Sequence, residues 1–501
     1  MIRTIGILTA FAFAAAAWAA PFNLVTLQQS LKTTKASWTA GPTGLHDLSM
    51  QEKRELLGLL DYVEITAFSE VRDEDYLDED LPLTHDWRNV NGKNYDTDMR
   101  YQGRCGSCVA FATVAAVEMQ LNITNKRPDL DLDFSEQHLF TCGGRSCSTG
   151  WYATSGLSYI QKYGVPDEQC FPYLSGNLGQ DLQCTQTCGD AKARLFTIPS
   201  FRTVTSGSEN IEVIKKALTE GPLLTTMRVY EDFYAYTGGV YEYKSGKMVG
   251  GHAVTMLGYD VERRAWLVKN SWGDAWGEGG YFWIRWGDVS GLGQSTYQPV
   301  VKSLEGFVKI TDPKDEAVLS GKVVFSVENT YTGATSVAYK LLSKGEVLSE
   351  QSKEAAPQTT FSLDTAALPD GAYDLVALVR RGEQEFRSHY LKVWILNTQP
   401  TLSLTLTDPV EGTVLSDKIL LSYSCGADQS IPFTVLRTVI EGAGVSKSFE
   451  VKNPCPAIKV RWTTFLFPNG EYTVRGIGLV GTKASVSSKP VKLSVKNPAK
   501  P

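Results

Sequence analysis

Residues 102–111 contain a cysteine in a setting that favours a nucleophile. The run reads Gln-Gly-Arg-Cys-Gly-Ser-Cys-Val-Ala-Phe, and the apolar segment after Cys108 contains no glycine or proline before Pro128. A helix that begins at Cys108 would direct its first amide groups and the positive end of its dipole at the sulfur. Such a position lowers the pKa of a thiol and favours the thiolate. A buried structural thiol is the alternative for a cysteine taken alone.

A thiolate nucleophile needs a base, and few histidines are available. Residues 81–303 contain only His85, His138 and His252. His252 lies in Gly-Gly-His-Ala-Val-Thr-Met, which reads as a buried strand, and Asn270 follows on what would be a neighbouring strand. There its amide could orient the imidazole. A core histidine is the alternative for His252 alone, and only its combination with Cys108 and Asn270 favours a nucleophile–base pair.

The composition and the N-terminus indicate the setting in which these residues work. The chain of 501 residues predicts about three domains, and 43% apolar and 21% charged residues exclude a disordered or fibrous chain. The net charge of −6 argues against a nucleic-acid partner. Residues 1–19 have a positive start, a short apolar core and the end Ala-Trp-Ala, which predict a secretory signal peptide. We therefore expect a secreted, periplasmic or cell-surface protein, from a bacterial host, with no membrane span.

The remaining chain divides into four blocks. Residues 20–80 are polar, lack cysteine and end in an acidic stretch, and Ser49 followed by Glu52 predicts a capped helix over residues 49–60. Residues 81–303 hold seven of the nine cysteines and read as a loop-rich mixed α/β domain. The last two blocks, 304–397 and 398–501, repeat each other.

The repeat is visible in turn sequences and in alternating strands. Thr-Asp-Pro at residues 311–313 recurs at 407–409, and Leu-Pro-Asp-Gly-Ala-Tyr at 368–373 is echoed by Phe-Pro-Asn-Gly-Glu-Tyr at 467–472. Runs with period-two alternation lie between these marks, as at residues 491–495. Blocks of about 100 residues with this pattern predict two β-sandwiches. The pair resembles the bacterial Ig-like modules that are appended to secreted enzymes.

The motifs of residues 81–300 resemble the papain family of cysteine proteases. Cys-Gly-Ser-Cys with His and Asn far downstream is the papain and cathepsin signature. Met-Val-Gly-Gly-His-Ala at 248–253 and the spacing of Cys184 and Cys188 are similar to the cathepsin B branch, as is the short N-terminal block with Leu-Leu-Gly at 56–58. The resemblance implies an α+β papain-like domain with a helical lobe and a β-barrel-like lobe, followed by two all-β Ig-like sandwiches. It also implies a secreted cysteine endopeptidase made as a zymogen, whose inhibitory propeptide, residues 20–80, is cleaved near residues 75–81.

The same resemblance implies roles for single residues. Cys108 would attack the peptide carbonyl and form an acyl-enzyme thioester, His252 would pass the proton to the leaving amine, and Asn270 would orient His252. Gln102 would supply the side-chain donor of the oxyanion hole. The substrate would contact Gly150, Gly251 and Trp272, the last of which also shields the His252–Asn270 pair from water. No metal and no organic cofactor is implied.

The number of cysteines fits this assignment. The resemblance implies the disulfides Cys105–Cys147, Cys142–Cys184 and Cys170–Cys188, and a fourth pair, Cys425–Cys455, is expected within the second Ig-like module. One thiol is left over from nine, and it is Cys108.

Departures from the family pattern predict the specificity. Cathepsin B has a histidine-containing occluding loop, whereas only residues 174–183 lie here between Tyr173 and Cys184, and none of them is histidine. We therefore expect an endopeptidase with an open primed side. Residues 291–295 carry no acidic side chain where the family closes its S2 pocket, which predicts apolar P2 residues. Val109 replaces the usual Trp beside the nucleophile and predicts altered packing only.

Two alternatives and several partners follow. The chain could be a non-catalytic adhesion or matrix protein on the papain scaffold, but such proteins typically replace the nucleophile, which is present here. The same residues could also transfer the acyl group to an amine. The expected partners are protein or peptide substrates, the chain's own propeptide, and a cell-surface or polymer ligand for the modules. Deletion of residues 304–501 is expected to leave hydrolysis intact and to weaken retention at a surface.

Overall fold

A computed structural model describes residues 22–60 and 81–497 of the chain. Short gaps fall at residues 44, 47, 399–400, 417, 427–430, 432, 453–456, 465–466 and 482–483. The predicted signal peptide and the predicted cleavage region before residue 81 lie outside the described residues.

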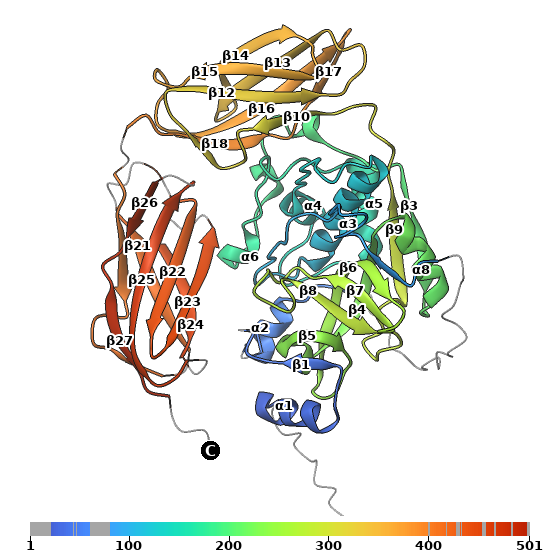
Figure 1. Ribbon diagram of the computed structural model, residues 1–501, viewed down its shortest axis with the longest axis vertical. Helices are drawn as coiled ribbons and strands as arrows, with labels where there is room; N and C mark the ends of the chain where they lie inside the picture. The colour runs from blue at the N-terminus through green and yellow to red at the C-terminus, as the bar shows by residue number, and fades with distance from the viewer. Residues whose placement is uncertain are drawn as a thin grey trace, which may run out of the picture.

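The first lobe of the protease region is built on a buried helix. α3 (Cys108–Thr124) is apolar on nearly all sides, and such a helix is stable only when other elements surround it. It packs against the helices α4 (Glu136–Cys142) and α5 (Ala153–Tyr163) and against strand β6 (Met248–Asp260). Shorter helical segments, α6 (Ser175–Leu178), η2 (Cys184–Gln186) and α7 (Ala191–Arg194), follow along the surface of this lobe (Figure 1).

The second lobe is a nine-stranded sheet in the order β1-β5-β8-β7-β6-β4-β9-β3, with β2 paired to β6. Its aromatic core includes Trp266, Trp276 and Phe282. The remaining bounds in this lobe are β1 (Trp38–Ala40), β2 (Thr84–Asp86), β3 (Ser200–Ser206), α8 (Ile211–Glu220), β4 (Leu223–Tyr230), η3 (Glu231–Ala235), β5 (Tyr236–Tyr241), β7 (Ala265–Lys269), β8 (Tyr281–Arg285) and β9 (Ser295–Val300).

The N-terminal block lies on the second lobe. α1 (Leu24–Thr33) packs beside β1, and β1 extends the sheet by antiparallel pairing with β5 (Figure 1). α2 begins at Met50 with the predicted capping box between Ser49 and Glu52, but it ends at Glu55. The prediction of a helix to residue 60 is therefore wrong at its end, because residues 57–60 leave the helix and run between the two lobes.

The last two hundred residues form two all-β modules with the same topology. The first has the sheets β10-β12-β15 and β11-β18-β16-β13-β14, and the second has β19-β21-β24 and β20-β27-β25-β22-β23. One further strand in each, β17 or β26, pairs with the strand at the centre of the larger sheet. The predicted class, a papain-like α+β domain followed by two β-sandwiches, is confirmed.

The strand bounds of the two modules correspond one to one. The first module has β10 (Val308–Asp312), β11 (Ala317–Leu319), β12 (Lys322–Asn329), β13 (Ser336–Ser343), β14 (Glu346–Glu354), β15 (Gln358–Asp364), β16 (Gly371–Arg381), β17 (Gln384–Arg387) and β18 (Leu391–Ile395). The second has β19 (Leu404–Asp408), β20 (Val414–Leu415), β21 (Lys418–Cys425), β22 (Val435–Gly442), β23 (Val445–Lys452), β24 (Ala457–Thr463), β25 (Gly470–Val480), β26 (Ala484–Ser487) and β27 (Val491–Val495).

Candidate active site

Cys108 is the first residue of α3 and the only cysteine without a disulfide among the described residues. Its side chain is completely buried. The sulfur accepts hydrogen bonds from backbone N–H groups, among them those of Ala253 and Gly58. Ala253 directly follows His252 on β6, so the strand that carries the histidine also contacts the thiol.

His252 is held in one orientation by Asn270. Its Nε2 lies 2.8 Å from Asn270 Oδ1, and the same oxygen accepts a hydrogen bond from the backbone N–H of Ser271 at 2.9 Å. Because this oxygen accepts both bonds, Nε2 carries the proton of the neutral ring. The other ring nitrogen, Nδ1, is buried and has no hydrogen-bond partner among the described residues. It is therefore available to accept a proton.

Trp272 covers the histidine pair from one side. Its ring stacks on His252 with centroids 5.0 Å apart, and Tyr234 also stacks on Trp272 with centroids 5.1 Å apart. All three rings are buried. The aromatic layer excludes water from the hydrogen bond between His252 and Asn270, which strengthens that bond electrostatically.

Both titratable groups are neutral in this state. Burial raises the pKa of Cys108 to about 11, although the surrounding backbone N–H groups act in the opposite direction. Burial also lowers the pKa of His252 to about 4, against the opposing hydrogen bond to Asn270. The expected lowering of the thiol pKa by the helix dipole is therefore overturned here, because desolvation of the thiolate outweighs the dipole.

The side-chain amide of Gln102 donates to carbonyl oxygens of both the protease domain and the N-terminal block. Its Nε2 donates to Cys105 O at 2.8 Å and to Leu56 O, in the N-terminal block, at 3.2 Å. Its Oε1 accepts a bond from Ser271 Oγ at 2.6 Å, which fixes the orientation of the amide. Gln102 Nε2 is thus already bonded to a carbonyl oxygen of a chain that lies between the lobes.

Tyr173 supports this arrangement, and the sequence analysis did not identify it. Its hydroxyl donates to Gln102 O at 2.8 Å and lies 2.7 Å from Ser107 Oγ, directly before the cysteine. The sequence contains no local signal for this contact, since Tyr173 is 71 residues from Gln102. Ser271 and Tyr234 were also missed, although both lie next to residues of predicted motifs.

After Leu56, which caps α2 in a helical conformation, residues 57–60 run as a non-helical chain between the lobes. Leu59 N donates to Gly251 O at 3.2 Å, Trp151 N donates to Gly58 O at 2.6 Å, and Leu60 N donates to Trp151 O at 2.9 Å. Gly58 lies so close to the protease that a Cβ there would be 1.9 Å from Gly106 O. Only glycine fits at this crossing.

The predicted contact residues surround this segment. Gly251 O accepts the hydrogen bond from Leu59 N. Gly150 packs against Gly58, because a Cβ at Gly150 would lie 2.4 Å from Gly58 O. Trp151, the residue after Gly150, makes backbone hydrogen bonds with Gly58 and Leu60 of this segment. His85 and His138 lie elsewhere: His85 contacts Trp87, and His138 contacts Tyr159.

The disulfides close the loops around the cysteine. The structure contains Cys105–Cys147, Cys142–Cys184 and Cys170–Cys188, the three pairs that the resemblance implies for this domain. Cys425 is disulfide-bonded, and its expected partner Cys455 lies outside the described residues.

Comparison with known proteins identifies the class. Residues 81–300 match the model of the papain family cysteine proteases. Cathepsin B-like CP3 of Giardia intestinalis is 32% identical over 285 residues, which cover 55% of this chain and 92% of that protein. Zingipain-2 of Zingiber officinale is 36% identical over 208 residues, which cover 40% of this chain and 87% of that protein. Among solved structures, procathepsin B S9 of Trypanosoma congolense aligns with 21% identity and a TM-score of 0.46, over 56% of this chain and 99% of that one.

The family model and the curated relatives show a cysteine protease, and the chain belongs to the papain family. The resemblance to its cathepsin B-like members is confirmed. In the described part of the chain, no helix is both long enough and apolar enough to cross a membrane.

Proposed function

We propose that the chain is a secreted cysteine endopeptidase made as a zymogen, with Cys108 as nucleophile, His252 as base and Asn270 as the residue that orients the base. One observation carries the proposal. A segment of the N-terminal block covers Cys108, and its Leu56 carbonyl accepts from Gln102 Nε2, the donor expected to stabilise an oxyanion. Export is supported by the predicted signal peptide and by three disulfides in the protease domain.

The chemistry follows from the positions of these groups once the N-terminal block has left. His252 Nδ1 takes the proton of Cys108, and the thiolate attacks the carbonyl carbon of the substrate. The oxygen becomes negative and accepts from Gln102 Nε2 and from the backbone N–H of Cys108 at the start of α3. Collapse breaks the C–N bond, and His252 delivers its proton to the leaving amine. Water then attacks the thioester with His252 as base, which releases the acid and restores the thiol.

The N-terminal block inhibits by occupying the groups that a substrate would use. The backbone N–H of Gly58 contacts the sulfur of Cys108. The Leu56 carbonyl accepts from Gln102 Nε2, so the expected oxyanion donor is occupied while the N-terminal block is bound. Burial of the thiol and of His252 further disfavours the ionised pair. Inhibition therefore follows from the occupied donor and from the burial of the neutral Cys108 and His252.

The path of the bound segment supports an endopeptidase. The chain passes continuously from α2, where Lys53 O accepts from Tyr234, across Cys108 to Leu60 beside Trp151. A segment that extends past the reactive cysteine in both directions favours a site that accepts the interior of a polypeptide chain. An internal cleavage assay tests this: a long peptide blocked at both termini should yield two fragments, whereas a strict carboxy-dipeptidase would leave it intact.

Covalent labelling tests the nucleophile and the base together. A thiol-directed epoxysuccinyl inhibitor should modify the activated protein at Cys108 in a one-to-one ratio, as read by mass spectrometry of its peptides. His252→Ala should abolish the modification, and His85→Ala should preserve it as a matched control. Absence of labelling in a processed, disulfide-complete protein would leave the binding-scaffold alternative.

A further inference from the structure

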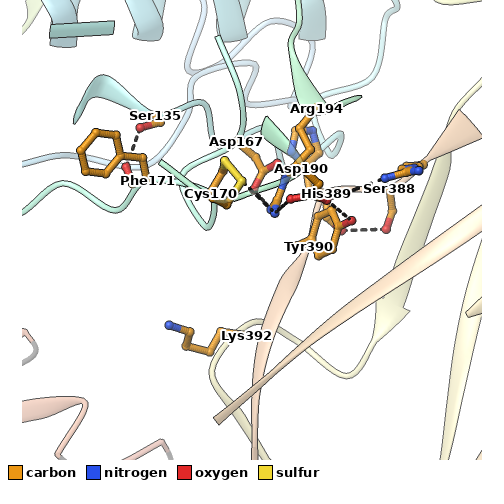
Figure 2. A network of polar contacts seen from close by, with 12 residues as sticks. Ser135, Asp167, Cys170, Phe171, Asp190, Arg194, Ser388, His389, Tyr390 and Lys392 are labelled. Atoms are coloured by element: carbon orange, nitrogen blue, oxygen red, sulfur yellow. Dashed lines mark hydrogen bonds and ion pairs between the residues drawn. A yellow bond between two sulfur atoms is a disulfide. The ribbon is translucent and has the colours of Figure 1, made fainter. Parts of the chain in front are cut away.

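The first Ig-like module contacts a segment of the protease domain that runs from Asp167 to Arg194. The contact centres on Tyr390, the residue directly before β18, which is only 6% exposed. Its ring lies 3.6 Å from the guanidinium carbon of Arg194, and its hydroxyl donates to Asp190 Oδ2 at 3.1 Å (Figure 2). Tyr390 thus packs on the protease, whereas the core of the module is built from residues such as Phe325 and Tyr339.

Arg194 joins the two ends of this 167–194 segment. It pairs with Asp167 at 2.5 Å and with Asp190 at 3.3 Å, and its own side chain is 6% exposed. A buried guanidinium needs such complete pairing, because an uncompensated charge away from water is costly. The ring of Tyr390 covers Arg194, where a cation–π contact adds to the two ion pairs. Beside it, His389 contacts Phe134 at 5.8 Å, next to the point where Phe134 pairs with Asp167.

Residues 168–176 of the same segment support the backbone of Gln102, the proposed oxyanion donor. Glu168 Oε1 accepts from Tyr173 N at 2.6 Å, and the hydroxyl of Tyr173 donates to Gln102 O. Gly176 packs directly on Gln102, since a Cβ at Gly176 would lie 1.9 Å from Gln102 O. A shift of this segment would therefore move the backbone that carries the Gln102 side chain.

We propose that Tyr390 is a positioning residue for the oxyanion hole, and that the first Ig-like module acts through the 167–194 segment and Tyr173 on Gln102. The inference rests on the proposed hydrolysis at Cys108. It makes the first module a working part of the protease rather than a spacer.

Other contacts keep the module in place when Tyr390 is changed. Arg127 pairs with Glu328 at 3.3 Å, and Lys309 pairs with Asp131 at 2.5 Å. These pairs join the module to a different loop of the protease, outside the 167–194 segment. A substitution of Tyr390 therefore tests the hold on the segment, without requiring that the module detach.

The experiment compares kcat and KM of activated full-chain variants, each normalised to its Cys108 titre with the epoxysuccinyl inhibitor. Tyr390→Ala should lower kcat about threefold to tenfold with KM changed less than about twofold, as expected for a residue that acts indirectly on the transition state. Asp190→Asn, which alters the same contact from the protease side, should act in the same direction. Tyr373→Phe, which removes a hydroxyl bonded to Pro369 O inside the module, is the matched control and should leave kcat unchanged.

A double-mutant cycle identifies the route. If Tyr390 acts through Tyr173, then Tyr390→Ala should add little to the loss already caused by Tyr173→Phe. Full additivity of the two losses, or an unchanged kcat per titrated site in Tyr390→Ala, would overturn the proposal. If Tyr390→Ala fails to fold, Tyr390→Phe and Asp190→Asn decide by the same criteria.

Hydrogen exchange separates this inference from the proposed function. Tyr390→Ala should speed amide exchange in residues 167–176 relative to the unchanged protein, whether or not the protein hydrolyses peptides. An inactive unchanged protein would refute the proposed function alone, and unchanged exchange in this segment would refute the inference alone.

Discussion

Trp38 should provide most of the specific hold of the N-terminal block on the protease. It lies in β1, opposite Gly239 of β5, and its side chain is only 2% exposed. Its ring packs on Tyr241 with centroids 5.0 Å apart, and its Nε1 donates to Glu242 O at 2.9 Å. Replacement by alanine removes both the ring and the hydrogen bond, while the strand pairing of the backbone stays possible.

The size of the effect follows from this burial. Truncation of a buried tryptophan to alanine costs about 3 kcal/mol or more, which corresponds to about a hundredfold weaker binding. Trp38→Phe retains most of the apolar contact and loses the indole donor, so about 1 kcal/mol and a fivefold change are expected. The two substitutions therefore separate the contribution of the ring from that of the hydrogen bond.

The assay adds residues 20–80 as a separate chain to the activated protease and measures the inhibition constant against a fluorogenic peptide. Lys32→Ala is the control, because Lys32 is exposed on α1 of the same segment and should inhibit like the unchanged sequence. If Trp38→Ala inhibited within about threefold of the unchanged segment, the burial argument would be refuted.

Three further predictions address the site and the fold. Gln102→Ala should lower kcat about 10² to 10³-fold with a smaller change in KM, because one oxyanion donor is lost; steady-state kinetics checks this. Iodoacetamide should alkylate Cys108 slowly in the zymogen until the pH approaches 11, and much faster at neutral pH after activation; equal rates at pH 7 would contradict the raised pKa. Burial lowers the pKa of His138 to about 4, so the folded protein keeps this histidine neutral. The stability of the folded state is therefore not reduced by His138 above pH 6.5, and it falls as the pH decreases from 6.5 toward 4. His138→Gln should flatten this part of the stability profile, by at most about 3 kcal/mol, in thermal unfolding followed against pH.

The structure brings together the residues of the proposed triad, and the sequence could propose them because their signals are local. The helix after Cys108 is apolar on all sides, and His252 and Asn270 lie on or next to neighbouring buried strands, so short motifs describe each of them. The structure also shows which nitrogen of His252 carries the proton. This follows from the backbone N–H of Ser271, which donates to the same Asn270 oxygen that His252 contacts. No motif could have supplied that detail.

The errors arise where a distant part of the chain competes with a local preference. The capping box at Ser49 set the start of α2, but the end was set by the protease, which bonds the Leu56 carbonyl through Gln102. The thiol pKa follows the same logic. The helix dipole at Cys108 is a local property, whereas the burial that outweighs it depends on how distant parts of the chain fold around the thiol.

The role of the first module shows how far this competition extends. Its repeat and strand pattern predicted a separate sandwich, and separateness suggested that it could be removed without effect on hydrolysis. The inferred role of Tyr390 predicts a different outcome, and the contacts behind it are distant in sequence: Tyr390 bonds to Asp190 across 200 positions and Arg127 pairs with Glu328 across 201. Both protease residues belong to loops whose only local signal is charge. From sequence, a charged loop residue is interpreted as solvent-exposed until the partner that buries it is known. A module that acts on an active site through such contacts is therefore interpreted, from sequence alone, as a spacer.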